Sequence, residues 1–529
     1  MGENKLLVLR DFHEFDPLQL DGATFGCAGF GTQNFKLGKV GFNTIFVIGM
    51  KQLKALAGET VLYGLGSIVP RFLNFLLVPL HTGVFNPADY GVITKLFAYV
   101  AVVNIILMFG METAYFRFAT KPGADKKRIF DLAQTVVLVI SVLLSLIFIL
   151  FANPLAAALD IPGNANLVVW LAIIMFMDAI VAIPFARLRL EKKAMQFAAG
   201  KLINVFILVG LNLYFLKIAY STSIGIEFVV MANLAANLFY LIFFARTLFS
   251  WRPVFDQQIS PAMFSYAYPV MITGLAGMTN EMFSRVTLEW WLPENFYTGQ
   301  SSEYALGIFG ACYKFGMLMS LTVTAFRYAA EPFFFSTAAD KSSPALFAKV
   351  NHYFIIACCV VFLAVGINLD ILKYFLRNEA YWDGLSIVPI LLLAYLFLGA
   401  YYNFSIWFKL TDKTHYGTIL TVGGAIITIT SNFLLIPVFG YWGSSLATLI
   451  CYFSMAISCY ILGQKFYPIP YSLYKSLLYI LITTVIVYSV NAITIPIPWA
   501  ATAVHFLVLG LYLAVVYLIE KAYFSQPVS

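Results

Sequence analysis

The chain has 529 residues, of which 61% are hydrophobic and 11% are charged, with a formal net charge of +7. A soluble protein carries roughly 25% charged residues. A soluble multidomain protein is therefore excluded, and the mean hydropathy of +0.84 predicts a polytopic membrane protein.

Apolar runs of about 20 residues recur along the chain, each long enough to cross roughly 30 Å of hydrocarbon as a helix. We expect an all-α membrane protein with fourteen transmembrane helices. They are predicted near residues 56–80, 90–116, 131–153, 165–186, 196–217, 224–246, 263–290, 303–327, 351–370, 385–408, 414–436, 440–463, 472–493 and 499–520. The loops between them are short, and the longest is 327–350.

Residues 1–49 differ from the rest because they are polar and Gly-rich and contain no spanning run. They also lack the basic end, apolar centre and cleavage site of a signal peptide. Met50 is followed by KQLKALAGETVLYGLG, a short cationic lead into the first span. We expect residues 1–49 to be either disordered or an extension upstream of a native start at Met50.

The positive charge is distributed unequally between the loops on the two sides of the membrane. Lys and Arg are densest in 117–128 and 187–193, whereas the opposite loops hold only Lys217, Lys373 and Arg377. The positive-inside rule places the dense segments in the cytoplasm. Because fourteen is even, both termini should be cytoplasmic. This placement explains the net charge without a nucleic-acid partner.

The chain also shows a weak internal repeat. When RLRLEKK (187–193) is placed on WFKLTDK (407–413), Asn212 falls on Asn432. Six spans return the chain to its starting side, so the repeats would be parallel, with a substrate path between them. We expect an N-terminal six-helix lobe at 50–250, a C-terminal six-helix lobe at 260–465, related by pseudo-two-fold symmetry, and two additional helices at 470–521.

Several stretches resemble bacterial oligosaccharide flippases of the multidrug/oligosaccharidyl-lipid/polysaccharide exporter superfamily, in the expected order from residue 50 to about 465. These are FNPADYGVITKL (85–96), GMETAYFRF (110–118), IPFARLRLEKKAMQF (183–197), SRVTLEWWL (284–292), LGIFGACYKFGMLMSL (306–321) and SNFLLIPVFGYWGSSLATLICY (431–452). The family often has Asp-Arg where this chain has Ser284-Arg285, and Glu281, one turn earlier, is a substitute for that acid.

The resemblance implies a multi-pass protein of the bacterial inner membrane with two six-helix lobes. It implies transport of polyprenyl-pyrophosphate-linked oligosaccharide from the cytoplasmic to the periplasmic leaflet. The substrates would be repeat units of lipopolysaccharide O-antigen, capsule or exopolysaccharide, with polysaccharide polymerase machinery as a further partner.

Five cations fall within the predicted spans, where a cation at mid-bilayer costs at least ~2.5–3.5 kcal/mol and usually faces a cavity or a partner. They are Arg71, Lys95, Lys201, Arg285 and Lys314. Lys314 lies near mid-depth and is either a cavity-facing substrate residue or a helix-pairing charge. Lys95, near the outer surface, either snorkels or serves the substrate, and Lys201 is expected at the cytoplasmic interface.

Two arginines are candidates to hold the pyrophosphate. Arg71 follows Pro70, which can bend the helix, and a guanidinium there could bind phosphate oxygens in a bidentate way or be structural. Arg285 shares a helical face with Glu281 and Glu289. Either Glu281 orients Arg285 towards the substrate, or the three form a stabilising ladder at the wet mouth of a cavity.

The acid Asp178, near mid-depth in the fourth span, suits the binding of a coupling ion, H⁺ or Na⁺. The alternative is a hydrogen bond to a neighbouring helix. The cysteines and histidines lack ligand spacing, so we expect no metal and no cofactor.

The function predicted is flipping of a lipid-linked oligosaccharide by alternating access, with membrane lipids around the tail. A multidrug or cation antiporter of the same superfamily and a lipid-linked peptidoglycan-precursor flippase are the alternatives. An enzyme is disfavoured, because outer loops such as 154–164 and 291–302 are too short to form a catalytic domain.

Overall fold

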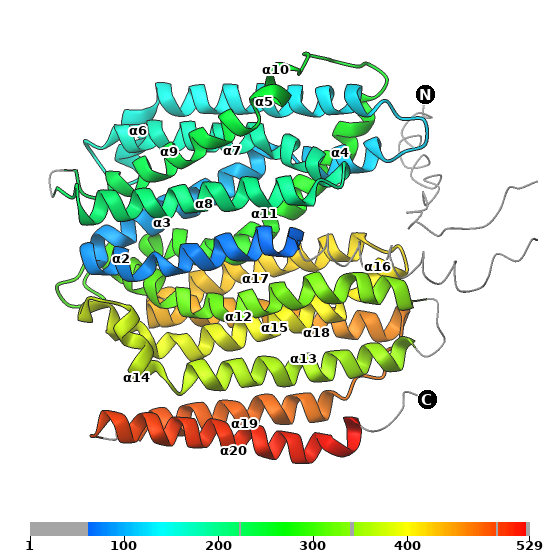
Figure 1. Ribbon diagram of the computed structural model, residues 1–529. Coiled ribbons are helices and arrows are strands. Elements are labelled where there is room, and N and C mark those ends of the chain that lie inside the picture. Colours follow the sequence, from blue (N-terminus) through cyan, green and yellow to red (C-terminus); the bar gives the residue numbers. More distant parts are fainter. Residues whose placement is uncertain (1–61, 222–223, 339–342, 494–495, 525–529) are drawn as a thin grey trace, which may run out of the picture.

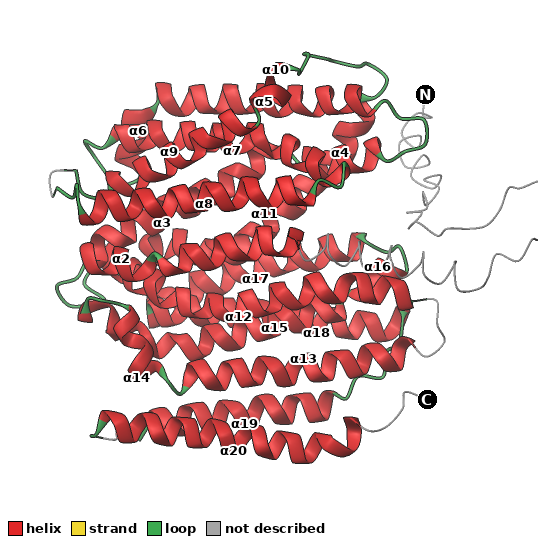
Figure 2. Cartoon of the chain, in the orientation of Figure 1, coloured by secondary structure: helices red, strands yellow, loops and turns green. Residues whose placement is uncertain are grey.

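The computed structural model describes residues 62–221, 224–338, 343–493 and 496–524, and these residues form helices and loops without a strand (Figure 2). The predicted extension 1–49 and the start at Met50 lie outside the described residues. The first described helix runs from Leu62 to Val84. In chain order the elements, counting the last part of that helix as α2, are α2 (Val78–Val84), α3 (Pro87–Met108), α4 (Met111–Ala119), α5 (Lys126–Leu150), α6 (Ala152–Ala158), α7 (Ala165–Leu190), α8 (Ala194–Lys217), α9 (Glu227–Phe243), α10 (Ala245–Phe249), α11 (Ser260–Trp291), α12 (Ser302–Thr337), α13 (Ser343–Gly366), α14 (Leu369–Leu372), the 3₁₀ helices η1 (Lys373–Phe375) and η2 (Glu379–Ile387), α15 (Val388–Phe404), α16 (Ile406–Leu410), α17 (His415–Phe439), α18 (Tyr441–Phe466), α19 (Leu473–Asn491) and α20 (Pro498–Phe524).

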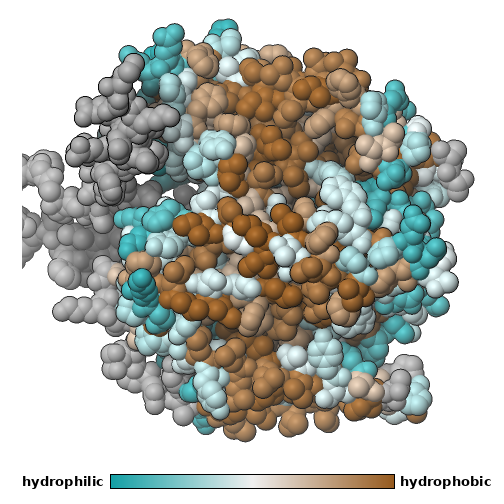
Figure 3. Space-filling view, turned by 180° about the vertical axis from the view of Figure 1, so that it is seen from behind, coloured by the Kyte–Doolittle hydropathy of each residue, from teal (hydrophilic) through white to brown (hydrophobic). Residues whose placement is uncertain are grey.

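The predicted multi-pass architecture is confirmed. Twelve helices of the described chain are long and apolar enough to cross a membrane. Figure 3 shows the matching surface, a broad hydrophobic band between hydrophilic rims at left and right. Two further predicted spans correspond to α9, which is apolar but has only 17 residues, and to α11, which carries three charged residues near its end. The total of fourteen spans stays a prediction.

Local sequence explains where several helices begin. Asn86 caps α3, its side-chain oxygen accepting from the backbone N–H of Asp89 at 3.0 Å, and Pro87 occupies the first turn. Asp125 caps α5 and Ser301 caps α12 in the same manner. These side chains satisfy backbone donors that the first turn leaves unpaired.

The helices run side by side in two groups, with α3 to α9 in the upper half of Figure 1 and α12 to α18 in the lower half. We call them the first and second lobes; their predicted boundaries stay predictions. Helices α19 and α20 lie beyond α13, at the lower edge. We name the two faces by the predicted orientation, so that α4 and α16 end on the cytoplasmic face (right in Figure 1) and α6 and α14 lie on the outer face (left).

Helix α11 belongs to both lobes. Its early residues Met263 and Ala267 pack into the apolar core of α3, α5 and α7. Leu288, near its other end, packs into the core that joins both lobes on the predicted outer face. At the break between α3 and α4, Gly110 has φ +68°, and a Cβ there would lie 2.4 Å from the carbonyl oxygen of Ala267. Glycine permits both the left-handed turn and this close approach.

One sequence prediction is wrong. The segment 327–350, expected as the longest loop, is mostly helical, because α12 continues to Thr337 and α13 begins at Ser343. The extension RYAAE is rich in helix formers, and Glu331 at its end pairs with Lys409 of α16. The charged residues of this segment lie on the end of a helix at the predicted cytoplasmic face. The sequence analysis assigned them to a loop because they interrupt the apolar run.

The internal repeat predicted from 187–193 and 407–413 has structural counterparts. Lys192 and Asp412, which the alignment pairs, both adopt positive φ, 56° and 57°. Each repeat also ties the end of its second helix to the end of its fourth by an ion pair. The two pairs are Glu112 with Arg189 in the first lobe and Glu331 with Lys409 in the second.

The aligned asparagines match as well. Both Asn212 and Asn432 are buried, and each donates to the carbonyl oxygen four residues earlier at 2.8 Å. Asn212 makes one additional contact, since its Oδ1 lies 2.9 Å from Nε2 of His81.

The connection into α11 is held by Asp256, outside the membrane-spanning segments. Its Oδ1 accepts from the backbone N–H of Gln258 at 2.8 Å and of Ile259 at 3.1 Å, and its Oδ2 lies 2.6 Å from Nη2 of Arg128. These backbone hydrogen bonds, and then the Arg128 guanidinium, hold the pKa of Asp256 below its usual value.

Candidate functional site: a cationic pair among tyrosines

Arg285 of α11 lies against the ring of Tyr313 on α12. Its guanidinium carbon is 3.9 Å from the ring centroid, and Nη1 is 2.7 Å from the sulfur of Met282. A guanidinium over an aromatic face gains ~0.5–2 kcal/mol, more as water is excluded. The stacking holds Arg285 in place without neutralising its charge.

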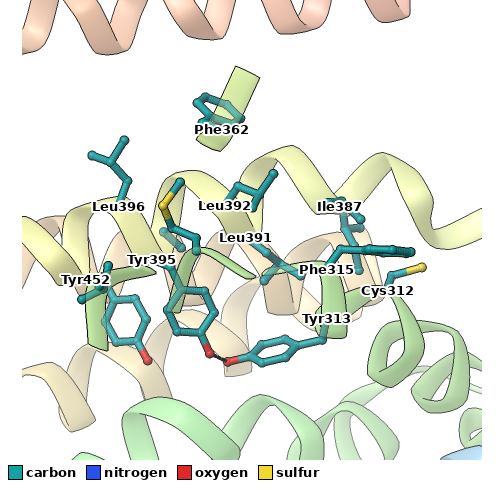
Figure 4. Packing of buried hydrophobic residues seen from close by; sticks show 14 of the residues in the cluster. Cys312, Tyr313, Phe315, Phe362, Ile387, Leu391, Leu392, Tyr395, Leu396 and Tyr452 are labelled. Atoms are coloured by element: carbon teal, nitrogen blue, oxygen red, sulfur yellow. Dashed lines mark hydrogen bonds between the residues drawn. The ribbon is translucent and has the colours of Figure 1, made fainter. Parts of the chain in front are cut away.

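Three buried tyrosines from three helices surround this arginine. Tyr313 of α12, Tyr395 of α15 and Tyr452 of α18 all act electrostatically on Arg285. Figure 4 shows the hydroxyls of Tyr313 and Tyr395 meeting in a hydrogen bond, with the Tyr452 hydroxyl directed to the same side. Behind them, Leu391 and Leu392 belong to the apolar core of the second lobe. The apolar core thus holds the phenol groups of the three tyrosines in place as one polar surface.

Lys314 follows Tyr313 on α12, and its ammonium acts on Arg285 as a like charge. It also acts on His81 of α2, so it faces the seam between the lobes. Within the described parts of the chain, neither Arg285 nor Lys314 forms an ion pair. We call Arg285 and Lys314 the central cationic pair. The sequence identified both residues but did not predict that they lie together.

Arg71 and Glu281 meet around a further tyrosine. Both act electrostatically on Tyr402 of α15, together with Arg327 of α12, whose guanidinium carbon is 4.8 Å from the Tyr402 ring centroid. Arg71 is exposed, as is Glu281. Sequence reasoning missed Arg327 because it was assigned to a loop, and the helix-forming RYAAE run was the signal that could have found it.

Asp178 lies away from the central cationic pair, in a cavity of about 420 Å³ in the first lobe. Its Oδ1 accepts from Nδ2 of Asn237 on α9 at 2.9 Å, and Asn104 is a second hydrogen-bond partner. Lys201 also lines this cavity, with Nζ 4.1 Å from the Phe185 ring centroid. The expected place of Lys201 at the interface is wrong, because α8 begins at Ala194 and carries Lys201 two turns inward.

The predicted ladder of Glu281, Arg285 and Glu289 is not formed. Arg285 is occupied by Tyr313, and Glu289 instead pairs with Lys95 of α3 at 2.7 Å. Because it is paired with Glu289, Lys95 is not part of the central cationic pair. The residue is only 1% exposed, so its side chain does not snorkel to the membrane surface. A cation paired across two helices needs no contact with water.

The geometry can bind an anion by charge and hydrogen bonds. A guanidinium and an ammonium that form no ion pair among the described residues offer several N–H donors, and the tyrosines add hydroxyls and ring faces. Phosphate oxygens match this set of donors. Sugar rings, whose C–H faces are apolar and whose edges carry hydroxyls, match the aromatic wall.

Comparison with known proteins gives one family match and several matches to solved structures. Residues 84–343 match the family model described as polysaccharide biosynthesis protein. A search of curated proteins finds no match. Among solved structures, the chain is similar to the lipid II flippase MurJ in an inward closed conformation. The identity is 13%, the match covers 87% of this chain and all of that one, and the TM-score is 0.68.

Two further structures are multidrug resistance transporters of the MATE family, in the MOP superfamily. The inward-facing structure is 14% identical over 77% of this chain and 97% of its own, with a TM-score of 0.59. The outward-facing one is 15% identical over 78% and 95%, with a TM-score of 0.53. At these identities the likeness concerns the fold alone. Residues 84–343 thus match the polysaccharide biosynthesis protein family, and the chain shares the fold of the MurJ and MATE structures.

Proposed function

We propose that the protein flips polyprenyl-pyrophosphate-linked oligosaccharide from the cytoplasmic to the periplasmic leaflet of a bacterial inner membrane by alternating access. The central cationic pair carries this proposal. Among the described residues neither Arg285 nor Lys314 forms an ion pair, and Glu281 acts on Arg285 as a single opposite charge. Burying such cations is costly unless a ligand anion compensates. A pyrophosphate supplies that anion.

The roles follow from the geometry. Arg285 is stacked on Tyr313, so its N–H groups are pre-oriented for bidentate contact with phosphate oxygens. Lys314 adds a compact charge. Arg71 and Arg327, around Tyr402, attract the headgroup earlier on its route from the cytoplasmic face, and Glu281 limits how tightly the anion is held. No covalent step is needed.

Energy coupling is assigned to the cavity in the first lobe. Asp178 there is close to the ammonium of Lys201 and accepts hydrogen bonds from amide side chains. A carboxylate that exchanges a proton or Na⁺ in this cavity would change the balance of charge with Lys201. Both termini are proposed to be cytoplasmic, with the polyprenyl tail in membrane lipid and polymerase machinery as the consumer of the product.

Two other functions have some support. The carboxylate of Asp178 in its cavity suits a multidrug or cation antiporter, and multidrug resistance transporters of the MATE family share the fold. The likeness to MurJ suits a lipid-linked peptidoglycan precursor, whose pyrophosphate the same cations would bind. The surplus of unpaired cations over acids near the central cationic pair favours an anionic lipid over cationic drugs.

The test is a leaflet-accessibility assay in proteoliposomes with a labelled polyprenyl-pyrophosphate oligosaccharide. We compare wild type with Arg285→Ala and Lys314→Ala. Lys126→Ala is the matched control, because Lys126 is exposed at the start of α5, far along the chain from the pair. Loss of translocation by ten-fold or more in the first two variants, with normal expression and a normal control, is expected.

The other outcomes identify the alternatives. Export of cationic dyes with no lipid translocation would replace the proposal by the drug exporter. Preference for a peptidoglycan precursor over the oligosaccharide lipid would favour that flippase. Normal lipid translocation by both variants would mean that the pair is structural and that the substrate path lies elsewhere.

A further inference from the structure

A buried ion pair joins the two lobes near the predicted outer face. Nζ of Lys95 on α3 lies 2.7 Å from Oε1 of Glu289 on α11, and the two side chains are only 2% and 6% exposed. Lys95 belongs to the first lobe, and this end of α11 packs into the second. Separation of the lobes on this side would break the pair.

Backbone contact between α3 and α12 closes the same region. A Cβ on Gly91, one turn before Lys95, would lie 1.9 Å from the carbonyl oxygen of Glu303. A Cβ on Gly307 would lie 1.7 Å from the carbonyl oxygen of Pro87. The two helices therefore touch without intervening side chains. We call this region the outer seam, formed by Pro87, Gly91 and Lys95 of α3, Glu289 of α11, and Glu303 and Gly307 of α12.

The outer seam holds more negative than positive charge. Oε2 of Glu289 is buried and receives no hydrogen bond in the described parts of the chain. The carboxyl of Glu303 acts on Glu289 as a like charge. Two ionised carboxylates that face each other in a buried place repel, and binding one proton removes this repulsion.

The groups around the seam do not remove this imbalance. Lys95 acts on both Glu289 and Glu303, and it supplies one positive charge for two acids. Tyr99, one turn further along α3, faces Glu289 and is also near Asp160 of the loop before α7. On α12 and its cap, Ser301 and Ser302 contact Glu303 and are neutral.

We propose that the closed outer seam binds one proton on its pair of acids, Glu289 and Glu303, and that the proton leaves when the lobes separate on this side. With the proton, one ammonium balances one net carboxylate. After separation, water solvates both carboxylates, Lys95 loses its buried partner, and the proton passes to the outer solution. Glu303, which is only partly buried, is the end of the pair nearer to that solution.

The mechanism makes closure of the outer side depend on pH. Because one proton is bound on closing, the ratio of closed to open lobes changes by at most about ten-fold per pH unit. High pH favours the open state and low pH the closed state. The inference rests on the alternating access of the proposed function, and it requires nothing about the substrate.

The experiment measures the distance between spin labels on the two lobes in the full-length protein, reconstituted without substrate. Asn166→Cys at the start of α7 and Thr298→Cys in the loop before α12 are exposed positions on the predicted outer face. The five cysteines in the described chain are buried. Spectra are compared across pH 5 to 9 for wild type, Glu303→Gln and Glu303→Ala.

The matched control is Glu331→Gln, because Glu331 is on the same helix and is also paired with a lysine, but at the other end. In wild type, the longer-distance population should grow with pH. Both Glu303 variants should lose this pH response, whereas Glu331→Gln should keep it. A pH-independent wild-type distance, or a full pH response in a folded Glu303 variant, would overturn the proposal.

The result is separable from the test of the proposed function. If the lipid is not translocated but the seam still responds to pH through Glu303, the substrate assignment fails and the proton site stands. If the lipid is translocated but the seam ignores pH, the proton site fails alone.

Discussion

Gly307 of α12 offers a direct test of the closed outer seam. In Gly307→Ala the new Cβ would lie 1.7 Å from the carbonyl oxygen of Pro87 and 3.0 Å from the backbone nitrogen of Gly91. Because carbon and oxygen atoms keep at least about 3.0 Å apart, α3 and α12 must separate by roughly 1.3 Å at this point. Neither atom belongs to a side chain that could rotate away.

The energetic cost follows from overpacking, which is typically ~1–3 kcal/mol. Alanine in a helix recovers up to ~1 kcal/mol relative to glycine, but it does so in both the closed and the open state. The gain cancels, so the closed state should lose about 1–3 kcal/mol relative to the open state, which changes their ratio by roughly 5- to 160-fold.

The assay is the same spin-label distance, at a pH low enough to keep wild type closed. Gly307→Ala should show a new longer-distance population. The control is Gly210→Ala in α8, where a Cβ meets nothing within 4 Å. An unchanged distribution in Gly307→Ala, or an equal change in Gly210→Ala, would refute the idea that backbone contact closes the seam.

Three further predictions concern other parts of the molecule. Asp178→Asn should reduce the dependence of transport on a proton or Na⁺ gradient by ten-fold or more with little change in substrate affinity, measured in the proteoliposome assay. Asp256→Asn should lower Tm at pH 7 and flatten its fall in acid. The pKa of Asp256 is held below its usual value in the folded state, so its stabilisation is present above the unfolded pKa and lost as pH falls through the folded one. Thermal unfolding across pH 3 to 8 checks this, and a parallel curve for the variant would contradict it. Asn212→Ala should cost more stability than Asn432→Ala, by ~1–3 kcal/mol for the partly buried His81 left without this hydrogen bond. Equal Tm losses would contradict the unequal roles.

Most of the helices could be predicted from the sequence, because a lipid environment permits few backbone structures. Spanning segments must be helical, so hydropathy alone placed the long helices, and Asn86, Asp125 and Ser301 marked three of their starts. Helix ends at the membrane surface were harder. The charged run beginning at Arg327 follows an apolar span and was taken for a loop, because a helix that continues into water has no hydropathy signal.

The sequence identified the charged residues of the candidate site, but it did not identify the residues that each of them contacts. Sequence reasoning selected the cations inside spans, since each is costly there. It could not tell which would find an acid on a helix distant in sequence, as Lys95 does with Glu289. It also left open whether Arg285 was a substrate residue or one step of a ladder along its own helix, because the tyrosine that contacts it comes from α12.

The partners sort the intraspan cations into two kinds. Lys95 is compensated by Glu289, and Lys201 lies close to Asp178. Replacing such a cation leaves the acid without its partner, so the main effect is a loss of stability at that contact or cavity. Arg285 and Lys314, in contrast, act on each other as like charges. The folded chain would be more stable without one of them, and proteins keep such destabilising arrangements at functional sites. Loss of either cation should therefore leave Tm unchanged or raised while lipid translocation falls.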